Sequence, residues 1–203
     1  MSVEVYDFRS DNVGGVAPEL LEALLDANRG TAAPYGDDDC TRAMTARFRH
    51  AFEHDGLLAF PLATGTGANA VALAGLANPY GAIYCHETAH INVYECGAPE
   101  LFTGAKLVGL AGDGYKLQAA ALDAALALAG RGNATRVQPF ALNLTQPTDF
   151  GTLYSIDELR NLSEAAHRHA QALADSAEHF VGRDREPAER QRGVVAAAVA
   201  EFD

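Results

Sequence analysis

The sequence predicts an α/β fold, in which a mostly parallel sheet is flanked by helices. Short apolar segments alternate along the chain with amphipathic or alanine-rich segments of helical length, and glycine-rich turns separate the two kinds. This alternation is typical of parallel strands joined by helical crossovers. The 203 residues, with 48% hydrophobic content, suffice to build a sizeable core.

The first part of the chain predicts an arm followed by two helices. Residues up to about Gly15 are polar and contain two adjacent glycines, which is typical of an arm or loop. The segment 18–27 carries leucines at helical spacing behind a proline in its first turn, and Gly30 follows as a stop signal. We expect a second helix over about 40–54, capped by one of the aspartates at 37–39.

Strands and helices alternate through the middle of the chain. We expect strands at 57–60, 82–85, 106–110 and 137–144. The helices expected between and after them cover 67–76, 91–96, 118–129 and 156–172. Ser155 and Glu158 form a capping box at the start of the last helix.

The pattern changes after about residue 171. The strand expected after the long helix is reduced to Leu173 and Ala174, and 175–203 is rich in Arg, Glu and Ala. We therefore expect three parts: an N-terminal arm with helices over 1–50, a partial large domain over 51–175, and a divergent tail over 176–203.

Charge and composition exclude several classes of partner. A formal net charge of -12 argues against nucleic-acid binding, which requires clustered positive charge. No apolar run approaches the length of a membrane span, and the first five residues form no basic apolar leader. Three cysteines without CxxC spacing indicate a reducing compartment and buried structural thiols. We expect a soluble cytoplasmic protein that binds neither nucleic acid nor membranes.

The segment 58–70 combines a predicted strand, a glycine-rich turn and a helix. Gly65 and Gly67 allow a ligand to approach the backbone closely, while Thr64 and Thr66 add hydroxyl groups. The helix that follows offers unpaired N–H groups and the positive end of its dipole. These are the components of a phosphate site, although the pattern is neither Walker A nor GxGxxG. A tight turn that only starts a helix is the alternative interpretation.

The segment 86–90 spells HETAH, which fits the HExxH zinc motif. That motif requires both histidines on one helix, whereas His86 directly follows a predicted strand. The glycine and third histidine of the longer zinc motif are also missing at their expected places. We therefore expect no metal site here, and a zinc hydrolase is the last of the alternatives.

Five segments in order resemble motifs of the threonine aldolases and related β-eliminating lyases. They are DFRSD at 7–11 (resembling LRSD), YGDD at 35–38 (YGED), ATGTGAN at 63–69 (PSGTxGN), His90 with YECGA at 94–98 (H…YExGA), and LTQ at 144–146 with GTLYS at 151–155. The resemblance covers about 5–173.

The resemblance implies the type I fold of enzymes that depend on pyridoxal 5'-phosphate (PLP), here as an incomplete large domain of such a transferase. It implies that Gly65 and Thr66 hold the cofactor phosphate, and that His90 stacks on the pyridine ring and lies near the proton-transfer chemistry. Asp175 would contact the pyridine nitrogen. Ser10 would lie near the substrate carboxylate, and Tyr35 near the site, reaching toward a neighbouring subunit of a homo-oligomer.

The sequence departs from the family after its long helix. Where the family has MDGAR and, later, the lysine that binds the cofactor covalently, this chain has ADSAE at 174–178, with Glu178 in place of the arginine. Its lysines are Lys106 and Lys116, both beside an early strand. We therefore expect no covalent attachment of PLP, and we expect the chain to be a truncation, a frame-shifted product or a shortened relative.

Two functions remain in view besides the zinc hydrolase. The resemblance implies a lyase that cleaves a β-hydroxy amino acid, a small amino acid substrate, to glycine and an aldehyde. Because the lysine is missing, we do not expect this chain alone to catalyse that reaction. The alternative is a non-catalytic remnant of a PLP fold that binds the cofactor or a partner subunit.

Overall fold

The computed structural model describes residues 13–76 and 78–177. The chain divides into two compact units, Met1–Phe60 and Pro61–Asp203. The described part of the first unit contributes two helices, and that of the second contains the sheet and its covering helices. None of the helices within the described ranges is long and apolar enough to cross a membrane.

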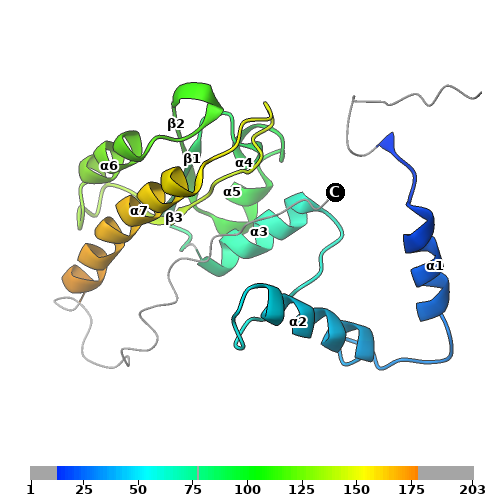
Figure 1. Cartoon of the computed structure of the whole chain (residues 1–203). Coiled ribbons are helices and arrows are strands. Elements are labelled where there is room, and N and C mark those ends of the chain that lie inside the picture. Colours follow the sequence, from blue (N-terminus) through cyan, green and yellow to red (C-terminus); the bar gives the residue numbers. More distant parts are fainter. Residues whose placement is uncertain (1–12, 77, 178–203) are drawn as a thin grey trace, which may run out of the picture. The chain divides into compact units, whose positions relative to one another are not determined.

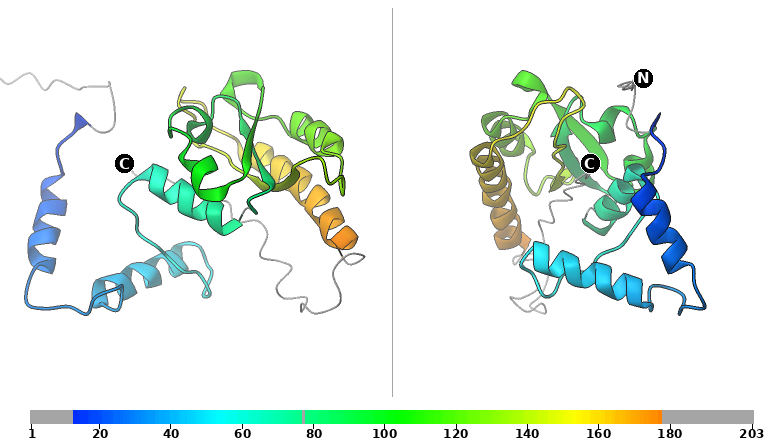
Figure 2. Two further views of the ribbon diagram at one scale, coloured as in Figure 1. Left: turned by 180° about the vertical axis from the view of Figure 1, so that it is seen from behind. Right: turned by 45° about the vertical axis from the view of Figure 1, so that its right-hand side comes forward.

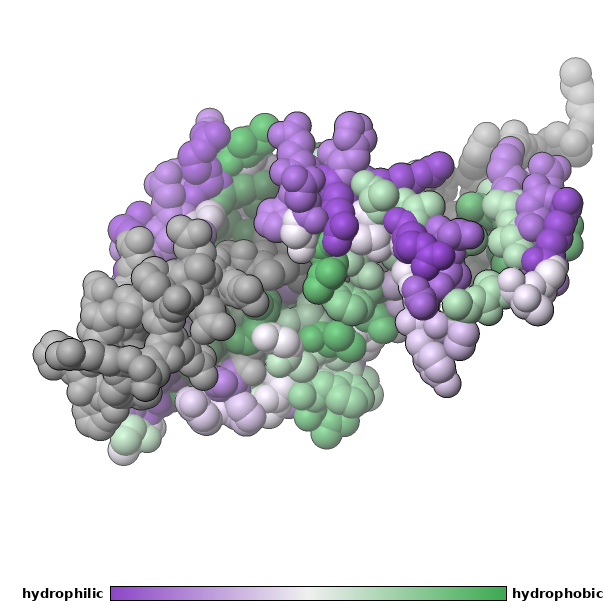
Figure 3. All heavy atoms as spheres, turned by 90° about the horizontal axis from the view of Figure 1, so that it is seen from below, coloured by the Kyte–Doolittle hydropathy of each residue, from purple (hydrophilic) through white to green (hydrophobic). Residues whose placement is uncertain are grey.

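The helices of the first unit are α1 (Pro18–Ala27) and α2 (Asp39–Ala51), which confirms both predictions. Asp38 caps α2, because its carboxylate accepts hydrogen bonds from the Thr41 amide at 2.8 Å and from the Thr41 hydroxyl at 2.7 Å. These bonds lower the pKa of Asp38. The apolar stripe of α1 is exposed at Leu20, Leu21, Leu24 and Leu25. Figure 3 shows hydrophobic residues reaching the surface on the face in view.

The strand predicted at 57–60 is wrong. These residues have no regular secondary structure, and the side chains of Leu58 and Phe60 are exposed. An apolar segment becomes a strand only where a neighbouring strand pairs with its backbone N–H and C=O groups. Here the Leu57 carbonyl instead accepts a hydrogen bond from the Arg49 side chain at 3.0 Å.

The sheet of the second unit consists of β1 (Gly81–His86), β2 (Lys106–Leu110) and β3 (Gln138–Leu142). The order is β2-β1-β3, and β1 pairs in parallel with both neighbours (Figure 1). This confirms the predicted parallel sheet and the three corresponding strands. All six residues of β1 are buried, as expected for a central parallel strand that is covered on both faces.

The helices α6 (Ala119–Leu128) and α7 (Ile156–Ala177) cover one face of the sheet (Figures 1 and 2). Ala82 and Tyr84 of β1 point to this face, because alternate residues of a strand point to opposite sides. They belong to a core cluster whose other members are Leu117, Leu122, Leu126, Tyr154, Leu162 and Ala165.

The helices α3 (Gly65–Leu76) and α5 (Ala98–Thr103) lie together on the other face. Ile83 and Cys85 of β1 point to this face and join a second core cluster with Leu73, Ala89, Ile91 and Ala105. Burial raises the pKa of Cys85 to about 12, so its thiol stays protonated. The other two cysteines are exposed, so the prediction of buried thiols is correct for Cys85 alone.

The helix predicted at 91–96 is present but shorter, and a second short helix, which was not predicted, follows it. The first, α4, covers His90–Val93, and α5 begins at Ala98. Between them, Cys96 and Gly97 have φ angles of 53° and 70°. A left-handed backbone of this kind cannot continue a right-handed helix, so the chain turns and starts again at Ala98. A 3-10 turn at Asp113–Tyr115 precedes α6.

The long helix α7 begins as predicted but ends later. Ser155 and Glu158 form the expected capping box: the Ser155 amide donates to Glu158 at 2.7 Å, and the Glu158 amide donates to the Ser155 hydroxyl at 3.2 Å. The strand expected at 173–174 is wrong, because α7 continues to Ala177. No Gly or Pro between His169 and Ala177 stops the helix.

The packing of α6 on the sheet predicts that the cost of replacing a leucine by alanine depends strongly on its position in the helix. Leu122 is 1% exposed and Leu128 is 74% exposed. Leu122→Ala should lower the free energy of unfolding by about 2–5 kcal/mol, because it leaves a cavity in the core. The matched substitution Leu128→Ala should change it by less than about 0.5 kcal/mol. Urea unfolding of both variants measures the difference, and equal effects would contradict the packing described.

The start of α7 predicts a pH-dependent contribution to stability. Hydrogen bonds from Lys116, at 2.7 Å, and from Ser155 lower the pKa of Glu158 from 4.5 to about 2. A lowered carboxylate pKa stabilises the folded state above pH 4.5, and the contribution is lost as the pH falls toward 2. Glu158→Gln should therefore lower Tm at pH 7, and the Tm difference from the parent chain should shrink between pH 4.5 and 2. Glu164→Gln, at an exposed site on the same helix, is the control; a Tm difference that stays constant with pH would contradict the assignment.

Candidate functional site

A cavity of about 200 Å³ lies where the connections after β1 and β3 meet the start of α3. In parallel sheets, ligands commonly bind outside the carboxyl ends of the strands. The residues lining the cavity are Gly65 and Asn69 of α3, His90 of α4, and the continuous loop 143–149 that follows β3.

The turn before α3 is built by Thr64. Its hydroxyl accepts a hydrogen bond from the Gly67 amide at 3.1 Å, and its carbonyl accepts one from the Ala68 amide at 3.0 Å. The amides of Gly65 and Thr66 belong to the same first turn, where N–H groups have no partner within the helix. A Cβ atom on Gly65 would meet nothing within 4 Å, so the wall of the cavity is open at this residue.

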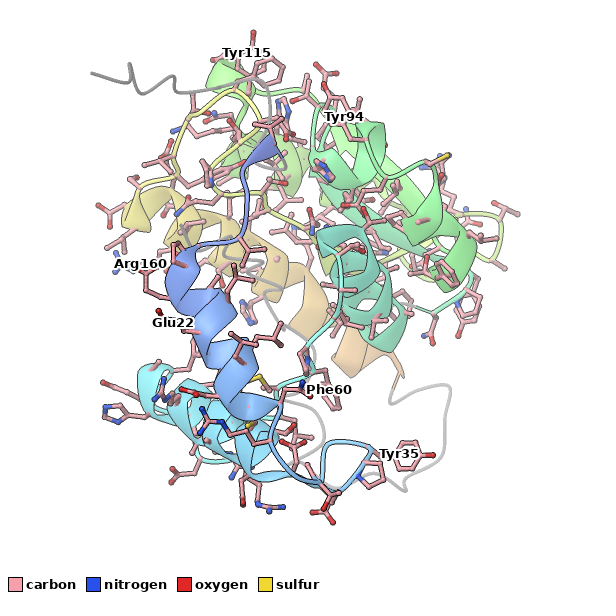
Figure 4. All side chains as sticks on the ribbon, turned by 90° about the vertical axis from the view of Figure 1, so that its right-hand side faces the viewer. Glu22, Tyr35, Phe60, Tyr94, Tyr115 and Arg160 are labelled. Atoms are coloured by element: carbon pink, nitrogen blue, oxygen red, sulfur yellow. The ribbon has the colours of Figure 1, made fainter. Side chains whose placement is uncertain are left out.

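His90 is the first residue of α4, and its side chain is 42% exposed. Its Nδ1 lies 2.8 Å from Oε1 of Glu95. Its ring centroid lies 5.7 Å from that of Tyr94, an exposed side chain labelled in Figure 4. The ring is therefore held on one side by a carboxylate while it still reaches the cavity.

Glu95 contacts two residues that line the cavity, although it does not line the cavity itself. Its side chain is fully buried, and its Oε1 accepts a hydrogen bond from Asn69 Nδ2 at 2.6 Å as well as contacting His90. Its other oxygen, Oε2, is buried and has no hydrogen-bond partner in the described part of the chain. Glu95 thus links α3 to α4 through one carboxylate oxygen.

The loop 143–149 extends the sheet and forms the opposite wall. The Asn143 amide donates to the Tyr84 carbonyl at 2.8 Å, so the loop leaves β3 still attached to β1. The Gln146 side chain accepts from the Tyr154 amide at 2.8 Å, and the peptide bond before Pro147 is cis. Asn143 Oδ1 is buried and, among the described residues, has no partner.

His86 and His90 do not form a zinc motif. His86 is the last residue of β1 and His90 the first of α4, so the two histidines do not share a helix, as the sequence predicted. The His86 ring instead contacts the Thr88 hydroxyl at 2.8 Å and the Gly112 carbonyl at 3.3 Å. Over residues 13–76 and 78–177, no group of three or more His, Cys, Asp or Glu could hold a metal ion.

The structure brings together some of the predicted site residues. Gly65 and His90 line the same cavity, and Thr66 follows Gly65 in the first turn of α3. Tyr35 belongs to the first unit, where its side chain is fully exposed on the loop before α2 (Figure 4). Ser10 lies outside the described residues. Asp175 lies within α7 rather than after a strand, and its side chain is outside the described part.

Sequence reasoning gave no role to Asn69, Glu95 or Asn143. Asn69 and Glu95 stand inside the segments that carry the family resemblance, so the signal for them was present. Their mutual contact joins positions 26 residues apart, and spacing alone does not reveal it. Asn143 lies within the strand predicted at 137–144 and carried no signal of its own.

Comparison with known proteins agrees with the fold. The family model of beta-eliminating lyases matches residues 7–178. The low specificity L-threonine aldolase of Pseudomonas aeruginosa is 41% identical over 165 residues, which are 80% of this chain and 46% of that protein. The enzyme of the same name from a Pseudomonas species is 38% identical over the same length.

A solved structure, that of Leishmania major threonine aldolase, superposes with a TM-score of 0.75 at 26% identity. It covers 81% of this chain, which corresponds to 47% of the Leishmania chain. The chain therefore spans about half the length of the relatives that it matches. By the match of the family model over most of its length, the chain belongs to the beta-eliminating lyase family.

Proposed function

We propose that the cavity between α3, α4 and the loop 143–149 holds pyridoxal 5'-phosphate, and that the chain is part of a threonine-aldolase-like lyase. The substrate would be a β-hydroxy amino acid, cleaved to glycine and an aldehyde. The observation that carries this proposal is that Gly65 and His90 line one cavity. The family resemblance implies that both residues contact the cofactor, Gly65 at its phosphate and His90 at its ring.

The residues at the cavity fit such a cofactor. The first turn of α3 offers the amides of Gly65 and Thr66 and the positive end of a 12-residue helix, which suit a phosphate group. Glycine at position 65 leaves open space where a side chain would stand. The partly exposed ring of His90 offers an aromatic face and a nitrogen for proton transfer. When bound, PLP supplies an electron sink for the electron pair released by cleavage of the Cα–Cβ bond.

Neither lysine of the chain lines the cavity. Lys116 donates hydrogen bonds to Glu158 at 2.7 Å and to the Leu153 carbonyl at 3.1 Å, and Lys106 stands on β2. We therefore propose that this chain binds PLP without a covalent bond. The same observation favours the second candidate function, a PLP-binding fold without catalysis of its own. Roles for Ser10, Tyr35 and Asp175, and assembly as a homo-oligomer, belong to the same proposal.

A change at the start of α3 tests the phosphate site. Gly65→Asp places a carboxylate where a Cβ meets no atom, and a negative charge suits the N-terminus of a helix. Two like charges 4 Å apart repel by about 4 kcal/mol at an effective dielectric constant of about 20. Titration with PLP, followed by absorbance, should therefore show at least about tenfold weaker binding.

Gly75→Asp is the matched control, because Gly75 lies near the other end of α3, also has open space at Cβ and does not line the cavity. Equal affinities of the two variants and the parent chain would refute the phosphate site.

Borohydride reduction of the complex separates the two candidate functions. Unchanged chain mass after denaturation, with no glycine formed from L-threonine, supports non-catalytic binding; an adduct at Lys106 or Lys116 would overturn the non-covalent proposal.

A further inference from the structure

The strongest unexplained feature of the site is the buried carboxylate of Glu95. It does not line the cavity, yet it contacts Asn69 and His90, which do. Its Oε2 is buried without a partner among the described residues. An unpaired buried oxygen destabilises the folded state. Any stabilising effect of the carboxylate on the site therefore comes from the contacts of Oε1 with Asn69 and His90.

Chemistry decides which atoms carry the protons. A carboxylate oxygen accepts hydrogen bonds, so Asn69 must donate through Nδ2 and His90 through an N–H at Nδ1. In a neutral imidazole, a proton on Nδ1 leaves Nε2 with a free lone pair. The amide of Asn69 is oriented in the same way, since its nitrogen faces Glu95 and its oxygen faces elsewhere.

We infer that Glu95 is a positioning residue, which fixes the Nδ1–H tautomer of His90 and thereby presents Nε2 as a hydrogen-bond acceptor on the wall of the cavity. Hydrogen bonds to an ionised group are about twice as strong as neutral ones, and burial strengthens them further. The chemical class that such an acceptor recognises is a donor such as a hydroxyl group. Recognition of a substrate hydroxyl by Nε2 rests on the proposed function, in which the substrate carries a β-hydroxyl group. The tautomer of His90 does not depend on that function.

The tautomer can be measured directly in the full chain without cofactor or substrate. Long-range 1H–15N spectra of protein labelled at the histidine ring nitrogens distinguish Nδ1–H from Nε2–H, and loss of one signal set in His90→Gln assigns His90. At a pH where the ring is neutral, we expect the Nδ1–H form to exceed the other by about tenfold, as one charge-assisted hydrogen bond would give.

Two substitutions at Glu95 test whether this residue causes the preference of His90 for the Nδ1–H tautomer. Glu95→Leu removes both oxygens and should abolish the preference, whereas Glu95→Gln keeps one acceptor oxygen and should retain part of it. Glu87→Leu, at an exposed position of the turn before α4, is the matched control and should leave the preference unchanged.

A majority of Nε2–H in the parent chain would overturn the inference, even if the Glu95 variants fail to fold. An unchanged tautomer ratio in folded Glu95→Leu would overturn it as well. Because no cofactor is present, either failure leaves the PLP titration of the Gly65 variants unaffected. Conversely, a chain with the expected tautomer but no affinity for PLP would refute the proposed function alone.

Discussion

The parallel pairing of β1 with β2 and β3 is the constraint on which the site depends. Parallel strands end at the same edge of a sheet, so the segments that follow β1 and β3 emerge next to each other. The pairing continues beyond β3, where the Asn143 amide still donates to the Tyr84 carbonyl. Because β1 is buried on both faces, this edge is fixed by two separate cores rather than by the loops themselves.

The cavity at that edge combines two kinds of polar wall. The start of α3 offers donors and a partial positive charge, which suit an anion. The other wall offers hydrogen-bond acceptors. The Asn143 side-chain oxygen is buried and has no partner among residues 13–76 and 78–177. In the tautomer that we infer, His90 presents the lone pair of Nε2, because Glu95 accepts a hydrogen bond from the proton-bearing Nδ1. A ligand with an anionic group and separate hydrogen-bond donors would match both walls, and a phosphorylated cofactor with a hydroxylated amino acid has these groups. The chain spans about half the length of the relatives that it matches, and this cavity belongs to the half it shares with them.

Much of this arrangement could be predicted from sequence because it depends on local patterns. The alternation of apolar and helical segments predicted the sheet, and Ser155 with Glu158 predicted the start of α7. Predictions failed where tertiary partners decide the outcome. Among the described residues, no strand pairs with the apolar residues at 57–60. The helix predicted at 91–96 ends at Val93, before the positive φ angles at Cys96 and Gly97. The family resemblance implied that Gly65 and His90 share one site, but the sequence could not show that Glu95 connects Asn69 to His90.

We propose that one cavity receives a phosphate at the start of α3 and a ring beside His90. Amide chemical-shift mapping of the 15N-labelled chain during titration with PLP tests it most directly. The largest shifts should occur at Gly65 and Thr66, with further shifts at His90 and in the loop 143–149. Inorganic phosphate should reproduce the first group of shifts without the second. Shifts confined to other parts of the chain, or none at saturating PLP, would refute a cofactor site in this cavity.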